Sequence, residues 1–261
     1  MQDGTGRLNS SSDLDRNCHF KQKKAIALDD FVVKNLIGMG MLGHVFIVQH
    51  KSSRMYFALK SIWKADVIDR NMLRHVLEER DAMIDIKHPF IYVPGGELFK
   101  WLRNFKYFYD HEAKFFAAEL LLAIESIHNH GYIYRDLKPE NICIDAHGHV
   151  KLVDFGFAKH VGNPEYSGRC TTRVGTPQYL APELLQKGGG YTQAVDWWAF
   201  GCLVYELLKG QTPFFSSPND TSFEIYTRVA LGKVSFGDRF TPHAKDLIRQ
   251  LLQYNLILRN D

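Results

Sequence analysis

Residues 134–141 read YRDLKPEN, and this stretch decides how the chain is interpreted. It places an acid, a lysine and an asparagine within six positions, at Asp136, Lys138 and Asn141. Three polar side chains on one short loop can be aimed at a single reaction centre, where fixed charges stabilise a transition state. The stretch therefore predicts an active-site loop.

Two more motifs follow this loop, and one precedes it. Asp154-Phe155-Gly156 begins eighteen residues after Asp136, and Ala181-Pro182-Glu183 closes the segment. Upstream, residues 38–45 form a GxGxxGxV run with glycines at Gly38, Gly40 and Gly43. Glycines allow backbone N–H groups to approach phosphate oxygens, although a plain hairpin turn explains the run equally well. A dinucleotide-binding fold would need a helix after Gly43, but Val45 opens a run that predicts a strand.

Local patterns predict three strands joined by short turns between Phe31 and Lys60, and a helix over 111–130 with Phe115 on its apolar side. Residues 157–190 are rich in Gly, Pro, Thr and Ser and predict a long loop.

A lysine and a glutamate at strand and helix positions suggest an ion pair. Lys60 ends the strand-like run Phe57-Ala58-Leu59-Lys60, and Glu79 lies nineteen residues later in an expected helix over 67–85. Such a pair could hold the ammonium against phosphate groups. A surface ion pair is the alternative.

The order of these motifs resembles the eukaryotic protein kinase superfamily, and within its AGC group the cyclic-AMP-dependent protein kinase catalytic subunits. The diagnostic segments are VPGGELF (93–99), YRDLKPEN (134–141), DFGFAK (154–159), GTPQYLAPE (175–183) and AVDWWAFG (194–201). The resemblance covers roughly residues 28–260 and implies a serine/threonine kinase, because Lys138 lies two residues after the catalytic acid. It also implies an α+β, two-lobed fold: a small antiparallel β-rich N-lobe and a larger α-helical C-lobe. The expected divisions are a flexible arm over 1–27, the N-lobe over 28–93 and the C-lobe over 94–261.

The resemblance implies ATP and Mg²⁺ as cofactors and assigns their contacts. Asp136 would accept the proton of the substrate hydroxyl, and Lys138 would steady the phosphoryl group. Asn141 and Asp154 would hold Mg²⁺, while Lys60, Glu79 and the glycine-rich run would hold the phosphates. Residues around adenine would be Val45, Ala58, Val93, Leu98 and Cys143. Met83, Tyr134 and Phe155 would form what remains of an apolar stack behind the Glu79 helix, and Asp196 would support the catalytic-loop backbone.

Further positions are implied for regulation and substrate choice. Thr172 resembles the phosphorylated threonine of the activation loop, with His75, Arg135 and Lys159 as its cationic partners. Glu97, Glu140 and Glu206 occupy positions that favour basic, arginine-containing protein substrates. Glu183 and Arg259 resemble a buried ion pair. Each of these residues could instead serve packing or surface charge.

Composition limits the classes of partner and compartment. A net charge of only +3 gives no argument for nucleic acid, and no apolar run reaches the ~20 residues that a membrane span needs. The four cysteines are scattered, which favours a reducing compartment, the cytoplasm first and the nucleus second. A regulatory subunit is a candidate partner. The polar N-terminus has no signal-peptide core, and the chain ends before the C-terminal tail of AGC kinases would begin.

The sequence departs from the family pattern between Pro89 and Val93. Only Phe90, Ile91 and Tyr92 separate two matching segments, whereas two strands and a turn need well over ten residues, so about 18 residues are absent. We therefore expect the N-lobe sheet to lack two strands and the Lys60–Glu79 pair to have little support. Three explanations stay open: an altered product of an active kinase gene, which we favour, a catalytically weak paralogue that acts by binding, or an unusual ATP cleft.

Overall fold

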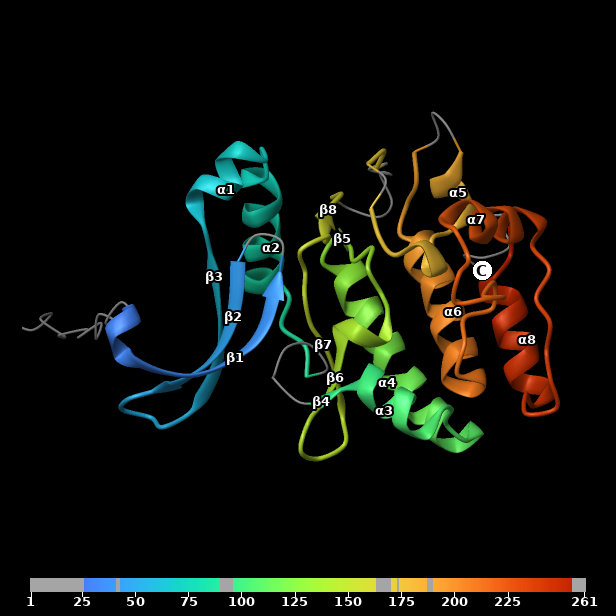
Figure 1. The fold of residues 1–261 in the computed structure, drawn as a ribbon, viewed down its shortest axis with the longest axis horizontal. Helices are drawn as coiled ribbons and strands as arrows, with labels where there is room; N and C mark the ends of the chain where they lie inside the picture. Colours follow the sequence, from blue (N-terminus) through green and yellow to red (C-terminus); the bar gives the residue numbers. More distant parts are fainter. Residues whose placement is uncertain are drawn as a thin grey trace, which may run out of the picture.

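The computed structural model describes residues 26–40, 43–89, 96–162, 170–172, 174–186 and 190–254. The chain divides into a small β-rich part and a larger helical part (Figure 1). The expected α+β, two-lobed kinase fold is thus confirmed. The expected boundary near residue 93 falls among residues 90–95, which lie outside the described ranges.

The N-terminal sheet is a three-stranded antiparallel meander. After a 3₁₀ turn at Leu28–Asp30, β1 (Phe31–Gly40), β2 (Gly43–His50) and β3 (Tyr56–Ile62) pair in the order β1-β2-β3. At Gly43 the backbones approach so closely that a Cβ atom would lie 1.8 Å from the Ser61 carbonyl oxygen. Among the described residues no strand after β3 joins this sheet, as the short interval after Pro89 had predicted.

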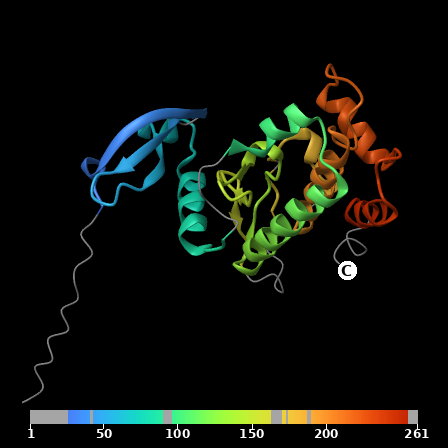
Figure 2. The ribbon, with the colours of Figure 1, turned by 90° about the horizontal axis from the view of Figure 1, so that it is seen from below.

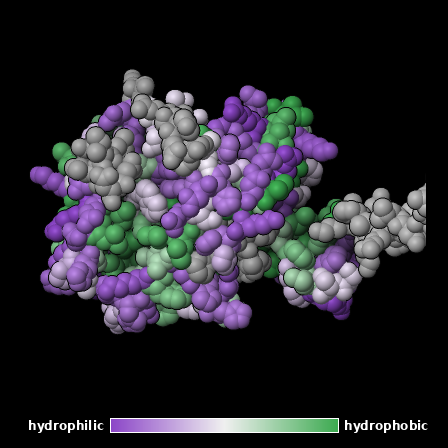
Figure 3. All heavy atoms as spheres, turned by 180° about the vertical axis from the view of Figure 1, so that it is seen from behind, coloured by the Kyte–Doolittle hydropathy of each residue, from purple (hydrophilic) through white to green (hydrophobic). Residues whose placement is uncertain are grey.

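The sheet has little core of its own. Within its described residues, Val48 is the single buried hydrophobic side chain. Val33, Met39 and Tyr56 are 55%, 76% and 58% exposed, and hydrophobic residues lie at the surface of this part in Figure 3. A sheet face without a packing partner contributes little burial free energy.

Two helices connect the sheet to the rest of the molecule. They are α1 (Lys64–Asp69) and α2 (Leu73–Asp85), in place of the single helix expected over 67–85. In Figures 1 and 2, α2 lies between the sheet and the helical part. Its residues Glu78 and Asp85 bond to Lys159 and to the Tyr132 hydroxyl, so α2 is fastened to the second part.

The helical part is built on two buried helices. They are α4 (Asp110–Asn129) and α6 (Ala194–Lys209), and the core around them includes Leu120, Ile127 and Trp198. The helix expected over 111–130 is confirmed, but Phe115, expected on its packed side, is 45% exposed. The remaining helices are α3 (Leu98–Phe105), α5 (Pro182–Leu185), α7 (Ser222–Leu231) and α8 (Pro242–Leu251). No helix in the described ranges is both long and apolar enough to cross a bilayer.

The helical part also contains five short strands and two 3₁₀ turns among its described residues. They are β4 (Gly96–Glu97), β5 (Tyr132–Ile133), β6 (Ile142–Ile144), β7 (Val150–Leu152) and β8 (Lys159–His160), with turns at Pro139–Asn141 and Pro177–Tyr179. The strands pair as β4-β6-β7 and β5-β8. The region 157–190, expected to be a long loop, therefore also holds β8, a turn and α5.

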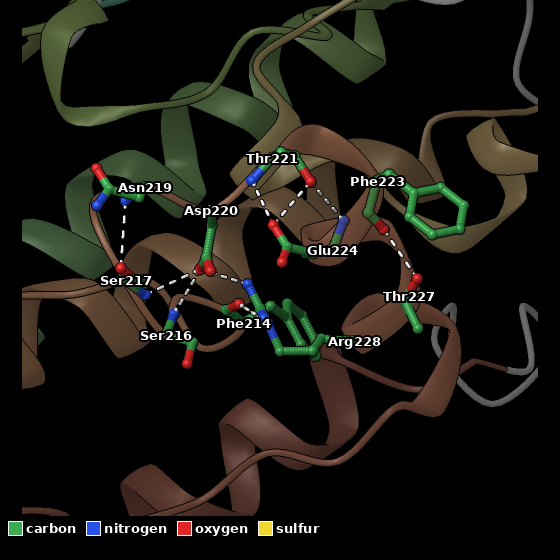
Figure 4. A network of polar contacts seen from close by, with 10 residues as sticks. All are labelled: Phe214, Ser216, Ser217, Asn219, Asp220, Thr221, Phe223, Glu224, Thr227 and Arg228. Atoms are coloured by element: carbon green, nitrogen blue, oxygen red, sulfur yellow. Dashed lines mark hydrogen bonds and ion pairs between the residues drawn. The ribbon is translucent and has the colours of Figure 1, made fainter.

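A surface network fixes the start of α7 (Figure 4). Thr221 and Glu224 bond reciprocally, Thr221 N to Glu224 Oε2 at 2.7 Å and Glu224 N to Thr221 Oγ1 at 3.3 Å. Asp220 accepts the N–H groups of Ser216 and Ser217 and pairs with Arg228. The helix N-terminus is thus satisfied by side chains, as capping requires.

Candidate active site

Three polar side chains surround the carboxylate of Asp136 on the catalytic loop. Asp136 Oδ2 accepts from Asn141 Nδ2 at 2.8 Å and lies 2.8 Å from Lys138 Nζ. Its Oδ1 accepts from the Thr176 hydroxyl at 3.2 Å, and Lys138 Nζ donates to the same Thr176 oxygen at 3.0 Å. The structure therefore brings Asp136, Lys138 and Asn141 together as predicted. Thr176 lies within a segment that the sequence singled out, but its contact with Asp136 was missed.

A buried acid holds the backbone of this loop. Asp196 is fully buried and accepts the N–H groups of Tyr134 and Arg135, each at 2.8 Å. Arg135 has a left-handed backbone (φ 70°), a conformation that costs free energy unless neighbours enforce it. His128 Nε2 lies 2.8 Å from Asp196 Oδ2, the oxygen that also accepts the Tyr134 N–H, and His128 was not predicted from sequence. The expected position of Asp196 behind the loop agrees with this geometry.

Tyr134 joins the catalytic loop to the segment that carries Asp154. Its hydroxyl donates to the Val153 carbonyl at 2.5 Å, and its ring meets Phe155 edge-on with centroids 5.3 Å apart. Burial, together with the nearby carboxylates of Asp154, Asp136 and Asp196, raises the pKa of Tyr134 well above its usual value. Met83, the third expected member of this stack, lies on α2 and is 42% exposed.

Two oxygen ligands for a divalent cation are available here. Asp154 is exposed, has a left-handed backbone (φ 62°), and accepts the Gly156 N–H through Oδ1. Asn141 turns its amide nitrogen to Asp136, which directs the amide oxygen away from that carboxylate. No group of three His, Cys, Asp or Glu suited to a metal occurs in the described part of the chain. Two oxygen donors fit Mg²⁺, which keeps waters and binds substrate phosphates.

The opposite side of the site presents a lysine. Lys60 on β3 pairs with Glu79 on α2, Nζ to Oε1 at 2.5 Å, with side chains 40% and 11% exposed. The pair is formed despite the short sheet. In the strand register Val45 lies opposite Lys60, Gly38 opposite Val45, and Gly40 opposite Gly43. The tip of the glycine-rich turn, residues 41–42, lies outside the described ranges.

Residues expected around adenine are placed in part. Val45 and Ala58 are half-buried on the sheet, and Leu98 and Cys143 are buried in the helical part. Val93 lies outside the described residues. The structure thus places four of these five residues, two on the sheet and two in the helical part.

The expected cationic cluster around Thr172 is only partly assembled. Thr172 is exposed, and its carbonyl oxygen accepts a hydrogen bond from the Tyr191 hydroxyl at 2.6 Å. The Tyr191 hydroxyl oxygen in turn accepts from Arg135 Nη1 at 2.8 Å. Arg135 Nη2 is buried without a partner among the described residues, so it has a free donor. Lys159 instead pairs with Glu78, and His75 is half-buried on α2. Tyr191 and Glu78 were not predicted from sequence.

The three acids expected to bind basic substrates have different surroundings. Glu97 is placed by its backbone in β4, opposite Cys143, and Glu140 is exposed. Glu206 accepts a hydrogen bond from the Tyr179 hydroxyl. Burial raises the pKa of Glu206 to about 7, which the Tyr179 bond opposes and the charge of Glu140 reinforces. Arg259, the expected partner of Glu183, lies outside the described residues.

Comparison with known proteins decides the family. Residues 90–260 match the model of the protein kinase domain. The chain belongs to the protein kinase family. This kinase chain is 41% identical over 244 residues to the human cAMP-dependent protein kinase catalytic subunit PRKX, covering 87% of the chain and 66% of that protein. The predicted resemblance to AGC kinases of the cAMP-dependent type is confirmed.

Two further relatives give the same picture. The cAMP-dependent protein kinase catalytic subunit of Dictyostelium discoideum is 41% identical over 243 residues, 86% of the chain and 36% of that protein. The one from Schizosaccharomyces pombe is 37% identical over 255 residues, 91% of the chain and 48% of that protein. The kinase chain thus spans between 36% and 66% of the length of these three relatives.

Proposed function

We propose that this chain is a serine/threonine protein kinase that transfers the γ-phosphoryl group of ATP to protein hydroxyl groups. The observation that carries the proposal is the arrangement around Asp136, where a carboxylate, an ammonium and an amide meet at 2.8 Å. The Thr176 hydroxyl already lies 3.2 Å from Asp136, within reach for the exchange of a proton.

Each residue has a role that follows from its chemistry. Asp136 orients the substrate hydroxyl and takes its proton, while the Lys138 ammonium offsets negative charge on the group in transfer. Asn141 and Asp154 would hold Mg²⁺, and Lys60, kept in place by Glu79, would hold the ATP phosphates. The cation, when bound, supplies charge neutralisation at the phosphate oxygens.

Basic protein substrates and a regulatory partner complete the proposal. The acids Glu97, Glu140 and Glu206 would attract arginine side chains of a substrate, since Arg matches carboxylate geometry. Phosphorylation of Thr172 would place charge near Arg135, whose Nη2 has a free donor. The relatives are named as catalytic subunits, which supports a regulatory subunit as a partner.

Transfer of labelled phosphate to an arginine-rich peptide tests the proposal. We expect Asp136→Ala to lower the transfer rate by about 10²–10⁴-fold, the usual loss for a general base. Asp246→Ala is the matched control, because Asp246 is exposed on α8 and bonds only locally to Gln250 among the described residues. Transfer that survives in Asp136→Ala at the parent rate contradicts the proposal.

A non-catalytic binding module is the second candidate, and the thin N-terminal sheet favours it. Val48 is the one buried hydrophobic residue among those described in the sheet, so little packing holds Lys60 in position. A thermal-shift measurement with ATP–Mg²⁺ separates the candidates, because a ligand that binds only the folded state raises its stability. The absence of any shift at millimolar nucleotide favours the binding module.

A further inference from the structure

A basic cavity lies away from the catalytic loop, where the C-terminal ends of α3 and α6 meet. It has a volume of about 450 Å³, within the range of ligand sites. The residues that line it include four cations, Arg103, Lys106, Lys209 and Arg239. A concave surface with an excess of one sign of charge focuses the field and attracts the opposite charge.

The charge of these cations is not neutralised by the protein. Within the described ranges, none of the four forms an ion pair. The acid in the cavity wall, Glu206, accepts from Tyr179, and burial raises its pKa to about 7. The four cations therefore outnumber this one acid, the cavity has a net positive charge, and an anion would relieve the repulsion between its cations.

Aromatic rings hold the two arginines of the cavity. The Arg239 guanidinium carbon lies 3.8 Å from the centroid of the Tyr107 ring, and that of Arg103 lies 5.6 Å from the Phe99 ring. Stacking restricts the planar guanidinium group before any ligand arrives, which lowers the entropy lost on binding.

The backbone beneath the cavity is also tightly joined. Phe108 N donates to the Leu207 carbonyl at 2.7 Å, which ties the loop after α3 to α6. Gly210 has φ +82°, and a Cβ atom there would lie 1.9 Å from the Lys106 carbonyl oxygen. Only glycine permits this approach, which holds the loop after α3 against the end of α6.

Helix dipoles explain only part of the cluster. Cations are favoured in the last turn of a helix, which accounts for Arg103 on α3 and Lys209 on α6. Arg239 comes from the loop before α8 and stacks on Tyr107, so a dipole does not explain its position. The convergence of three chain segments on one hollow points to a ligand.

We propose that this cavity binds the phosphoryl group of a phosphorylated serine or threonine on a protein ligand. A phosphoryl group carries nearly two negative charges and three acceptor oxygens, which suits several cations better than a single carboxylate does. Because binding is measured without catalysis, the proposal stands or falls separately from kinase activity, and Asp136→Ala leaves it unchanged.

The test follows backbone amide signals in ¹⁵N-labelled full chain during titration with inorganic phosphate, then with a phosphoserine peptide and its serine and aspartate forms. We expect the phosphate-induced shifts to concentrate at Gly210 and Gln211, which line the cavity. We expect Arg239→Gln to weaken binding by about tenfold, the loss of a charged hydrogen bond.

Arg249→Gln is the matched control. Arg249 also stacks on an aromatic ring, with its guanidinium carbon 5.0 Å from the Phe236 centroid, but it does not line the cavity. Its change should leave the affinity for phosphate within about twofold, since remote surface charges contribute little. Equal weakening by both changes, or shifts centred elsewhere, overturns the proposal.

Two further outcomes are decisive. An aspartate peptide that binds as tightly as the phosphoserine peptide overturns the phosphoryl assignment. Should Arg239→Gln fail to fold, Lys209→Gln carries the same test, with weakening of about fivefold expected from one lost charge. Unchanged affinity in that variant overturns the proposal.

Discussion

The two halves of the candidate active site rest on very different foundations. The catalytic loop is bonded to Asp196 on α6, in a core that includes fully buried Trp198 and Leu203. Lys60 belongs to a sheet in which Val48 is the one buried hydrophobic side chain among the described residues. Its ion pair is with Glu79 on α2. Because well-packed neighbours hold a polar side chain in one position, we expect the helical half of the site to be rigid and the sheet half to be mobile.

The largest effect is expected at Asp196. Asp196→Ala would leave the N–H groups of Tyr134 and Arg135 without their acceptor in a buried site, and we expect a loss of about 3–5 kcal/mol in unfolding free energy. Urea unfolding followed by circular dichroism measures it.

Asp220→Ala is the matched control for that experiment. Asp220 also accepts two backbone N–H groups and pairs with a cation, but in a surface turn (Figure 4). A smaller loss is expected there. Equal losses in unfolding free energy for the two variants would show that the burial of Asp196 behind the catalytic loop adds nothing to stability.

The second effect concerns pH and belongs to the helical half. Burial raises the pKa of Glu206 to about 7, so the folded state holds this proton more tightly than the unfolded chain does. Stability from this group is therefore fully present below pH 4.5 and is lost as pH rises to about 7, by about 2–3 kcal/mol. Urea unfolding at pH 5 and pH 8 should show the loss in the parent protein.

Glu206→Gln should remove most of this pH dependence, while Glu125→Gln, at an exposed position on α4, should keep it. A pH dependence that is the same in Glu206→Gln and the parent contradicts the assignment to Glu206.

A pair of valines compares the two halves directly. Val204 on α6 and Val48 on β2 are 5% and 1% exposed. Val204→Ala should lower the main unfolding free energy by about 2 kcal/mol, from lost burial and the cavity left behind. Val48→Ala should instead speed amide hydrogen exchange in β1–β3 and leave the main transition unchanged. Equal shifts of the main transition would show that the sheet unfolds together with the helical part.

The smallest effect on stability is expected at Lys60. Its side chain is 40% exposed, so breaking the pair with Glu79 by Lys60→Met should cost less than about 1 kcal/mol. The same change should remove the thermal shift caused by ATP–Mg²⁺, whereas Lys34→Met, at an exposed position on β1, should preserve it. An undiminished nucleotide shift in Lys60→Met contradicts the phosphate-binding role.

Sequence patterns were sufficient for several elements because they are local. The strand-like runs and turns in residues 31–60 predicted the three strands, and the apolar spacing over 111–130 predicted α4. The grouping of Asp136, Lys138 and Asn141 also follows from proximity along the chain. The exposed Phe115 was misjudged because periodicity identifies a face of a helix and does not show what covers that face.

The sequence by itself determined the family, the order of the motifs, the short interval after Pro89 and the residue types of the catalytic loop, since these depend on neighbours along the chain. Tertiary structure alone decided that the Thr176 hydroxyl donates to Asp136, 40 positions earlier in the chain, and that Glu78 forms an ion pair with Lys159. It also decided that four cations line one cavity. The physical reason is that contacts between distant segments depend on how helices and strands pack, which no local pattern of residues records.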